Sequence, residues 1–451
     1  MVETEIKIQR YESYKDSGVE WLGEIPEHWE TRRIKYIFNE INERSEDGNE
    51  DLLSVSQYTG VTNKSDKVEA GGMLTNAETL EGYKKVAKGD LVSNIMLAWN
   101  GSLGFSPFNG ITSPAYSIYR IYGENDNRYF HYLLRTELYK AEFKRNSSGV
   151  IESRLRLYTD DFFKIEAILP PLPEQTAIAQ FLDDKTTKID QAIAIKQQQI
   201  ALLKERKQIL IHKAVTRGVP KRHPELDSGS HPVKLKDAGV EWIGEIPEHW
   251  EVASVKYILE IPITDGPHTT PQLYEVGIPF ISAEAIKNGK IDFNKKRGFI
   301  SEKDHQLFCL KYKPKRNDIY MVKSGATTGN IAMVNTDEEF SIWSPLAVFR
   351  TNNDRMLPSF LYNFLESQAF KKGVELSWSF GTQQNIGMGV LSNLPISIPP
   401  LSEQKEIANY IETASAKIEN AINLKEQEIS KLQEYKSSLI NSVVTGKVKV
   451  L

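Results

Sequence analysis

The chain has 451 residues, of which 40% are hydrophobic and 26% are charged, and its formal net charge is −4. This composition is typical of a globular protein, and the length suits three or four structural units. A single cysteine excludes a disulfide framework, and no apolar run approaches the roughly 18 residues of a membrane span. The first residues have no apolar signal region, so we expect a cytoplasmic protein that does not contact a membrane. The near-neutral charge argues mildly against a nucleic-acid partner, and any DNA-binding surface should be a local patch.

A block of sequence near the N-terminus occurs twice. KDSGVEWLGEIPEHWETRRIKYI at 15–37 recurs as KDAGVEWIGEIPEHWEVASVKYI at 236–258, with 17 of 23 positions identical. Such a repeat indicates a tandem duplication. We expect each copy to form a rigid apolar strap around its two tryptophans. His28 and His249 should be structural hydrogen-bonding residues, because no second cluster of His, Cys or carboxylates has metal-ligand spacing.

The two stretches that follow these blocks, 38–169 and 259–398, share a plan. Each alternates short segments of β-rich composition with Gly, Asn and Pro, which predicts a mixed, mostly β domain. The strand-like segments are LLSVSQYTGV, DLVSNIML and AYSIYRIY in the first stretch, and IPFISAEAI, NDIYMVKSG, NIAMVN and LAVFRT in the second. A helix is predicted after them in each stretch, at Tyr129–Arg145 and at Ser359–Val374.

A second repeat begins with Pro-Pro-Leu-x-Glu-Gln, at Pro170 and again at Pro399. Proline is tolerated at a helix start, so we expect long helices from near Pro173 and Ser402, with Ser402 as an N-cap. Two apolar rows then recur every seven residues, and so narrow a stripe must be buried against another helix. Each copy is the simplest partner for the other, in an antiparallel pair; ordinary core helices are the alternative. The predicted seam residues are Leu182, Ile189, Ile193, Ile200, Leu203, Leu210, Ile411, Ile418, Ile422, Ile429, Leu432 and Leu439.

Polar residues interrupt the two seams at matched positions. A polar seam residue costs stability but can fix the register and orientation of the pair. The matched residues are Thr186 and Ser415, Lys196 and Lys425, and Lys207 and Lys436.

The repeats divide the chain into five segments. These are a first globular domain at 1–170, a first long helix at 171–218, a linker at 219–235, a second globular domain at 236–398 and a second long helix at 399–451. The linker is rich in Pro, Gly, Ser and charged residues. The predicted fold class is α+β: two mixed, mostly β domains joined by two long antiparallel coiled-coil helices, related as a pseudo-two-fold tandem duplication.

Motifs for catalysis are missing from the sequence, and the candidates that remain are loops suited to DNA contact. The loop Lys323–Asn330 combines glycines with side-chain donors and could approach a phosphate, with a tight β-turn as the equal alternative. The stretch Ser377–Asn385 offers amides for adenine, and its counterpart Arg145–Arg156 offers arginines for guanine or phosphate, unless these are solvated surface charges. The candidate DNA-binding residues are Arg145, Arg154, Arg156, Lys323, Ser324, Thr327, Thr328, Asn330, Thr382, Gln383, Gln384 and Asn385.

The repeated W-[LI]-G-E-I-P-E-H-W block, the repeated P-P-L-x-E-Q-x-x-I-A helix start and the long heptad helices together resemble the specificity subunit of Type I restriction–modification enzymes. The resemblance covers nearly the whole chain in the right order. It implies that each globular region is a target-recognition domain that reads one half of an asymmetric bipartite DNA site. It also implies that the helix pair sets the gap between the half-sites, and that the subunit has no catalytic residue, cofactor or metal of its own.

The resemblance further implies the partners of the chain. They are double-stranded DNA, two copies of a modification subunit that uses S-adenosylmethionine, and a restriction subunit that uses ATP and Mg²⁺. Two other functions remain open on the residues alone. One is an enzyme, a nuclease or methyltransferase, which activity of the isolated chain would favour. The other is a scaffold that joins two proteins without DNA, which binding without sequence preference would favour.

Overall fold

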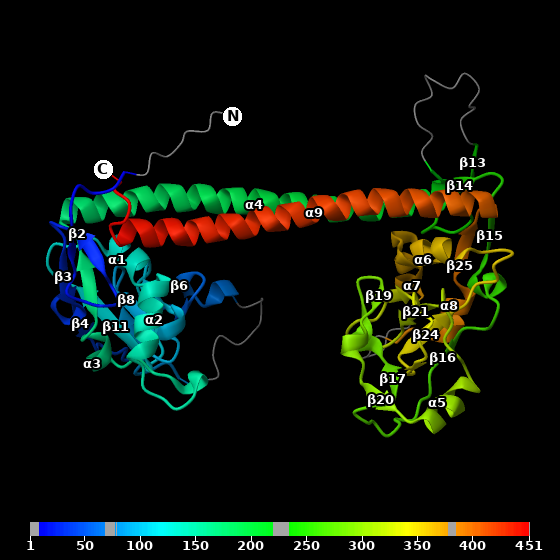
Figure 1. The fold of residues 1–451 in the computed structure, drawn as a ribbon, viewed down its shortest axis with the longest axis horizontal. Helices are drawn as coiled ribbons and strands as arrows, with labels where there is room; N and C mark the ends of the chain where they lie inside the picture. Colours follow the sequence, from blue (N-terminus) through cyan, green and yellow to red (C-terminus); the bar gives the residue numbers. More distant parts are fainter. Residues whose placement is uncertain (1–8, 68–76, 78, 220–233, 378–384, 451) are drawn as a thin grey trace, which may run out of the picture. The chain divides into compact units, whose positions relative to one another are not determined.

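The structure is a computed structural model that describes residues 9–67, 77, 79–219, 234–377 and 385–450. These residues form two compact units, and Figure 1 labels many of their helices and strands. The first unit comprises the chain up to Lys196 together with the chain from Glu426 onward, and the second comprises Gln197–Lys425. Each unit therefore contains one globular region and part of each long helix. Residues 220–233, which are most of the predicted linker, lie outside the described residues.

The first unit is built on a four-stranded antiparallel sheet in the order β4–β11–β8–β9. Ile118 of β11 pairs with Ile41 on one side and with Val92 on the other, and it is fully buried. The described residues of the unit also form the two-stranded pairs β1–β2, β3–β12, β5–β6 and β7–β10. The strands are β1 (Tyr14–Asp16), β2 (Glu24–Pro26), β3 (Glu30–Arg33), β4 (Phe38–Ile41), β5 (Leu53–Ser56), β6 (Gly60–Asn63), β7 (Lys84–Val86), β8 (Leu91–Asn94), β9 (Leu103–Phe105), β10 (Gly110–Thr112), β11 (Tyr116–Ile121) and β12 (Glu166–Leu169).

The second unit repeats this sheet as β16–β24–β21–β22, and it repeats two of the pairs as β13–β14 and β15–β25. It adds the sheet β20–β17–β23, in which β17 and β23 are parallel, and the short hairpin β18–β19. The strands are β13 (Leu235–Asp237), β14 (Glu245–Pro247), β15 (Glu251–Ser254), β16 (Thr264–Asp265), β17 (Ile278–Ile281), β18 (Ile286–Lys287), β19 (Lys290–Ile291), β20 (Gly298–Ile300), β21 (Ile319–Val322), β22 (Ile331–Met333), β23 (Ser341–Ile342), β24 (Leu346–Phe349) and β25 (Pro395–Ile398).

The short helices differ from the prediction in one respect. Each stretch predicted as a single helix consists of two helices, because a polar residue in its middle acts as an N-cap. Thr136 caps the second helix of the first unit and Ser367 that of the second unit, each through its hydroxyl oxygen. The helices are α1 (Asn127–Leu133), α2 (Glu137–Arg145) and α3 (Thr159–Phe162) in the first unit, and α5 (Glu302–Cys309), α6 (Pro358–Glu366), α7 (Gln368–Leu376) and α8 (Met388–Asn393) in the second.

Two long helices, α4 (Leu172–Arg217) and α9 (Leu401–Val444), run antiparallel and side by side within each unit (Figure 1). All twelve predicted seam residues are buried or half-buried. Three of the polar seam residues, Lys196, Lys207 and Lys436, reach carboxylates on the partner helix. Lys436 lies 2.7 Å from Asp190 in the first unit, and Lys207 lies 2.7 Å from Glu419 in the second. The predicted antiparallel pair is thus confirmed, with ion pairs that fix its register.

The start of α9 corrects one detail of the prediction. The helix begins at Leu401, so Ser402 lies inside its first turn and is not the N-cap. The carbonyl of Pro400 accepts the amide of Gln404 at 3.0 Å and thereby opens the helical hydrogen-bond ladder.

Each strap is held on the start of a long helix by one glutamate. In the first unit Glu174 accepts hydrogen bonds from the indole of Trp29 and the hydroxyl of Tyr11, both at 3.0 Å, and lies 2.5 Å from His28. Burial and the neighbouring carboxylate raise the pKa of Tyr11 above its usual value, so its hydroxyl remains a donor. In the second unit Glu403 makes the equivalent contacts with the indole of Trp250, at 3.0 Å, and with His249, at 2.7 Å. In each unit the strap and the start of the long helix therefore supply each other's hydrogen-bond partners.

The glutamine next to each of these glutamates places a short helix. Gln175 accepts the backbone amide of Asp126, directly before α1, at 2.9 Å. Gln404 accepts the amide of Leu357, directly before α6, at 2.8 Å. The Glu-Gln pair therefore ties both the strap and the helical layer of each unit to its long helix.

Candidate nucleic-acid interface

The central sheets of the two units carry the same ion pair at the same place. The buried carboxylate of Asp90 accepts two hydrogen bonds from Arg120 of β11, at 2.7 and 2.9 Å. The buried carboxylate of Asp318 accepts two from Arg350, directly after β24, both at 2.7 Å. These hydrogen bonds raise the pKa of both arginines above the usual value. These two ion pairs align the central sheets of the two units, so that the units can be compared residue by residue.

The segments predicted to contact DNA attach to equivalent positions of these sheets. The amide of Leu157 donates to the carbonyl of Ile95, directly after β8, at 2.8 Å. The amide of Ile386 donates to the carbonyl of Lys323, directly after β21, also at 2.8 Å. Ile95 and Lys323 are therefore structural counterparts, and so are the residues that precede the two amides.

Those preceding residues, Arg156 and Asn385, are both exposed. Their bridge partners differ, because Arg156 forms an antiparallel bridge with Ser148, after α2, and Asn385 forms one with Ser324, after β21. The hydrogen bonds of Leu157 and Ile386 nevertheless place a guanidinium and a carboxamide at one position of a shared backbone frame. These groups differ in the bases that they pair with most favourably.

The other candidates in the first unit are Arg145, which lies just before the segment between Ser148 and Arg156, and Arg154, which lies on it. Arg145 is the last residue of α2, and its guanidinium lies 3.1 Å from the carboxylate of Glu142. Arg154 ends a 3-10 turn that begins at Glu152 and is exposed. Arg145, Arg154 and Arg156 are therefore all accessible to a ligand, and none of them is buried in the core.

The candidates in the second unit lie mainly on the loop that follows β21. This loop is a tight turn, in which the amide of Gly329 donates to the carbonyl of Val322 at 2.8 Å and Gly325 has a φ of 104°. Thr327 and Asn330 are exposed on it, and Ser324 lies opposite Asn385. The amides of Thr328, Gly329 and Asn330 donate to carbonyls within and beside the turn, whereas the side chain of Thr327 is exposed at the surface. Thr382, Gln383 and Gln384 lie outside the described residues.

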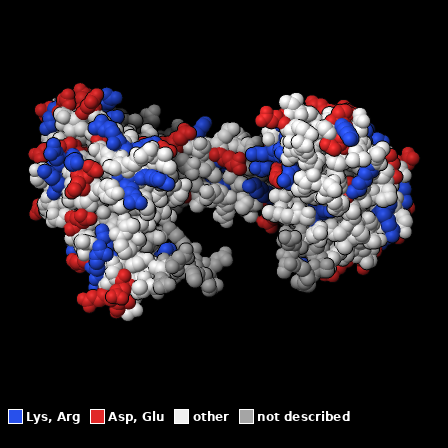
Figure 2. All heavy atoms as spheres, turned by 90° about the horizontal axis from the view of Figure 1, so that it is seen from below, with Lys and Arg blue, Asp and Glu red and all other residues white. Residues whose placement is uncertain are grey.

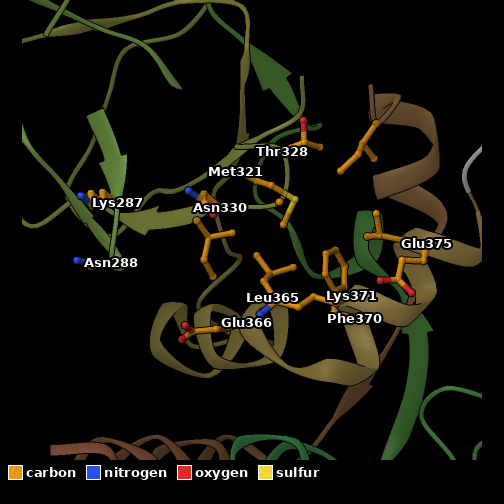
Figure 3. Close-up of a pocket in the computed structure, with 15 residues that line it drawn as sticks. Lys287, Asn288, Met321, Thr328, Asn330, Leu365, Glu366, Phe370, Lys371 and Glu375 are labelled. Carbon is orange, nitrogen blue, oxygen red and sulfur yellow. The ribbon is translucent and has the colours of Figure 1, made fainter. Parts of the chain in front are cut away.

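A cavity of about 550 Å³ lies beside this loop. Figure 3 shows Thr328 and Asn330 on the side of the loop and Leu365 and Phe370, from α6 and α7, on the side of the helices. Met321 of β21 also lines it. Charged side chains, among them Lys371 and Glu375, also line the cavity, which makes it more polar than a typical small-ligand site.

A charged cluster near the same loop was missed at the level of sequence. Asp265, the last residue of β16, is 1% exposed and lies 2.5 Å from the amine of Lys311. Lys323 and His268 each lie 3.2 Å from its other oxygen. Burial raises the pKa of the Asp265 carboxyl, but the two lysines outweigh burial and the pKa is below its usual value. The cluster joins residues far apart in the chain, and only the turn sequence Asp-Gly-Pro-His could have indicated it.

Charge on the two units is distributed without one dominant sign. Figure 2 shows basic and acidic side chains interspersed with uncharged surface on the visible face of each unit. In the part of the chain that the structure describes, no group of three or more His, Cys, Asp or Glu side chains could hold a metal ion. Nor does any described helix have the length and apolar content needed to cross a membrane. Contacts with DNA would therefore depend on local groups.

Comparison with known proteins connects both units to one family. The model of the type I restriction modification DNA specificity domain matches residues 26–205 and 247–430. The type I restriction enzyme MjaVIII specificity subunit of Methanocaldococcus jannaschii is 26% identical over 444 residues, which are 94% of each chain. The type I restriction enzyme EcoBI specificity subunit of Escherichia coli is 27% identical over 305 residues, which are 66% of this chain and 61% of that relative.

Two solved structures share the fold at 14% sequence identity. One, from a structural study of complex assembly and conformational transition of the type I R-M system, has a TM-score of 0.66 and is matched over 93% of this chain and 98% of its own. The other is the HsdS subunit of Thermoanaerobacter tengcongensis, with a TM-score of 0.51 and coverage of 94% and 98%.

Proposed function

Because the chain belongs to the family of type I restriction modification DNA specificity proteins, we propose that each unit reads one half of an asymmetric bipartite DNA site. The observation that carries this proposal is the shared frame with different side chains, Arg156 in the first unit and Asn385 in the second. A guanidinium pairs best with guanine and a carboxamide with adenine. Two units that are alike in backbone and unlike at this position suit two different half-sites.

The long helices would set the gap between the half-sites. Their buried seam and their cross-helix ion pairs make a stiff pair, and α4 has 46 residues, or roughly 70 Å at about 1.5 Å per residue. Successive major-groove faces of DNA recur every 34–36 Å or so, and a rod of fixed length would therefore permit only certain gaps.

A paired insertion tests this role of the helices. One heptad is inserted after Lys196 and one after Lys425, where both helices pass from one unit to the other. The seam stays in phase, and the pair lengthens by about 10 Å per heptad. We expect the gap in the methylated sequence to grow by about three base pairs, with both half-sites unchanged, when modified adenines are mapped in cells that carry the variant system.

A longer variant and a control sharpen this test. Three heptads at each position add about 31 Å, close to one turn of DNA, and should be tolerated better because the groove faces return into phase. Two residues in one helix alone break the seam and should abolish modification. A longer rod that methylates the original sequence with the original gap would refute the proposal.

Apolar side chains on the outside of the helix pair suggest where the modification subunits bind. Ile195 on α4 is 56% exposed, and Leu424 on α9 is 60% exposed. The two residues are equivalent in the repeat, and each lies next to a seam position. Leu202 and Ile209 continue the row on α4 and are also exposed. A third apolar row on a two-helix pair is typical of a surface that another helix covers. Two equivalent positions suit two copies of one partner.

Charge substitutions test this binding surface. Ile195→Glu and Leu424→Glu should each remove one copy of the modification subunit, and the double variant both, as counted by native mass spectrometry of the reconstituted complex. Gln191→Glu and Asn420→Glu are matched controls, because these residues are also equivalent in the repeat, are exposed and are already polar. Full occupancy in the double variant would contradict the assignment.

The chemistry of the system would then lie in the partner subunits. We propose that this chain carries no catalytic residue or cofactor, that the modification subunit binds S-adenosylmethionine, and that the restriction subunit binds ATP and Mg²⁺. Methyl transfer to DNA should require both this chain and the modification subunit. Methyl transfer by the isolated chain would refute this division of roles.

A further inference from the structure

The cluster around Asp265 has more positive than negative charge. Lys311 and Lys323 both form ion pairs with this one carboxylate, and His268 lies at the same oxygen as Lys323. No other acidic side chain of the described residues forms an ion pair with either lysine. A buried carboxylate requires only one cation to neutralise it. The second lysine therefore leaves a positive charge that is not compensated within the protein.

Lys311 is held so that part of its amine remains available. Its Nζ donates to Oδ1 of Asp265 at 2.5 Å and to the carbonyl of Gly266 at 3.1 Å. An ammonium group has three donors, and the third is left for an acceptor outside these contacts. The Lys311 side chain is 46% exposed and that of His268 is 69% exposed, whereas Lys323 is only 12% exposed. An approaching anion would meet Lys311 and His268 first.

The turn that carries the cluster packs closely against β23 and borders a cavity. A Cβ on Gly266 would lie 2.0 Å from the carbonyl oxygen of Ile342, so only glycine fits where the turn presses on β23. A cavity of about 220 Å³ opens here and is lined by Asp265, Thr269 and Lys311, among others. Lys311 is the cluster's donor that lines this cavity, and His268 lies at the other oxygen of Asp265. A small anionic group in the cavity would therefore meet the amine of Lys311.

The first unit lacks this cluster. In the register of the central sheets, Asp265 corresponds to Asn42 and Lys323 corresponds to Ile95. Neither of these residues carries a charge. The cluster is therefore not part of the frame common to both units, and it belongs to what distinguishes the second unit.

We propose that Lys311 and His268 bind one backbone phosphate of the DNA in the half-site read by the second unit, with Asp265 and Lys323 as positioning residues. This inference rests on the proposed function. A phosphate contact fixes the position of a protein on the duplex without reading its sequence. Lys323 begins the loop that lies opposite Asn385, so the same contact would hold that loop in register with the bases.

Salt dependence separates this role from a purely structural one. Each neutralised phosphate contributes about 0.9 to the slope of log K against log salt. In the complex with the modification subunit, Lys311→Gln should lower that slope by about one unit. Its loss of affinity relative to the native complex should therefore shrink about three- to fourfold between 50 and 200 mM salt. The methylated sequence should remain the same.

Two further variants keep the test decisive. Lys313→Gln is the matched control. Lys313 lies two residues after Lys311 and pairs with the exposed Glu339, so the substitution removes the same charge outside the cluster. The slope of this variant should equal that of the native complex. Lys311→Arg retains the charge and should restore the slope. A Lys311→Gln complex with a lower melting temperature and an unchanged slope would show an ion pair of structural importance only, and would overturn the proposal.

Neutral backbone analogues locate the contact. A methylphosphonate linkage is placed at one position of the DNA at a time, and native and Lys311→Gln complexes are compared. One linkage, in the half-site of the second unit, should weaken the native complex and leave the Lys311→Gln complex unaffected. Equal effects on both complexes at every position would refute the phosphate contact. If the native complex showed no sequence preference at all, the proposed function would fail instead, and the two failures are thus distinguishable.

Discussion

The first unit holds its strap more tightly than the second unit does, although the two straps are almost identical in sequence. Glu174 receives hydrogen bonds from three side chains and is 14% exposed, whereas Glu403 receives them from two and is 34% exposed. The additional donor is Tyr11, which lies before the repeated block. A duplicated motif therefore reproduces a set of contacts, and the residues around the motif decide how strong these contacts are.

The largest difference is expected when the two glutamates are removed. Glu174→Ala leaves the indole of Trp29 and the hydroxyl of Tyr11 buried without an acceptor, at a cost of about 4 kcal/mol when each contributes 1–3 kcal/mol or so. Glu403→Ala leaves one such donor, on Trp250, and should cost about 2 kcal/mol. Thermal unfolding gives the two values, and hydrogen exchange followed by mass spectrometry assigns each loss to its unit. Equal losses would show that Tyr11 adds nothing.

The glycines that follow the long helices offer a second comparison. Gly446 and Gly218 both have a positive φ, 75° and 85°. A Cβ on Gly446 would lie 2.4 Å from Pro26 and 3.0 Å from Trp29, whereas one on Gly218 would approach only Trp250, at 3.6 Å. Alanine should therefore cost about 3 kcal/mol at Gly446, from backbone strain plus the clash, and about 1 kcal/mol at Gly218, from strain alone. Melting temperatures of the two variants test this order; a smaller loss at Gly446 would show that the strap yields at Pro26.

The fold could be predicted from the sequence because the duplication showed which segments of the two halves correspond. The heptads predicted that α4 and α9 pair, and the Pro-Pro sequences predicted where the two helices begin. The prediction of one continuous helix in each globular region was wrong, because a single side chain interrupts each helix despite the apolar pattern around it. Thr136 and Ser367 each stop one helix and cap the next, and a hydrophobic pattern does not distinguish a cap from a polar residue on a helix surface.

The candidate site was less predictable, because it depends on contacts between distant segments. The equivalence of Arg156 and Asn385 follows from hydrogen bonds to residues directly after β8 and β21, and the sequences of the two segments share little. Asp265 and Lys311 are brought together only by the fold. The sequence suggested loops of suitable chemistry, and the assignment of individual bases to Arg156 and Asn385 stays a prediction.

A third comparison concerns pH. Gln175 accepts the amide of Asp126, and Gln404 accepts the amide of Leu357. His131 of α1 and Tyr362 of α6 each lie five residues after these amides and are therefore counterparts. Burial, together with the nearby Arg135, lowers the pKa of His131 to about 4. Tyr362 has its pKa raised by burial and does not titrate in acid. Only the first unit should therefore lose stability through this position as the pH falls.

The sign follows from proton uptake. Above its ordinary pKa of about 6.5, His131 is neutral in both the folded and the unfolded chain and its burial costs nothing in charge. As the pH falls from about 6.5 to about 4, the unfolded chain binds a proton that the folded chain does not, and stability decreases by about 2.6 kcal/mol. His131→Gln should remove this part of the acid dependence and leave that of the second unit unchanged, as hydrogen exchange at pH 7 and pH 5 would show. An unaltered pH dependence would place the titration elsewhere.

The smallest effect is expected from exchanging the two counterparts at the proposed DNA surface. Both side chains are exposed, so Arg156→Asn and Asn385→Arg should leave the melting temperature unchanged. Each exchange should alter the preferred base at one position of its own half-site, with a discrimination of about 1 kcal/mol, or about fivefold in affinity. Mapping of methylated adenines with each variant complex gives both half-sites in one experiment. A change in the half-site of the other unit would contradict the proposal that each unit recognises its own half-site. A change confined to the unit's own half-site would show that Arg156 and Asn385 determine which bases the two units recognise.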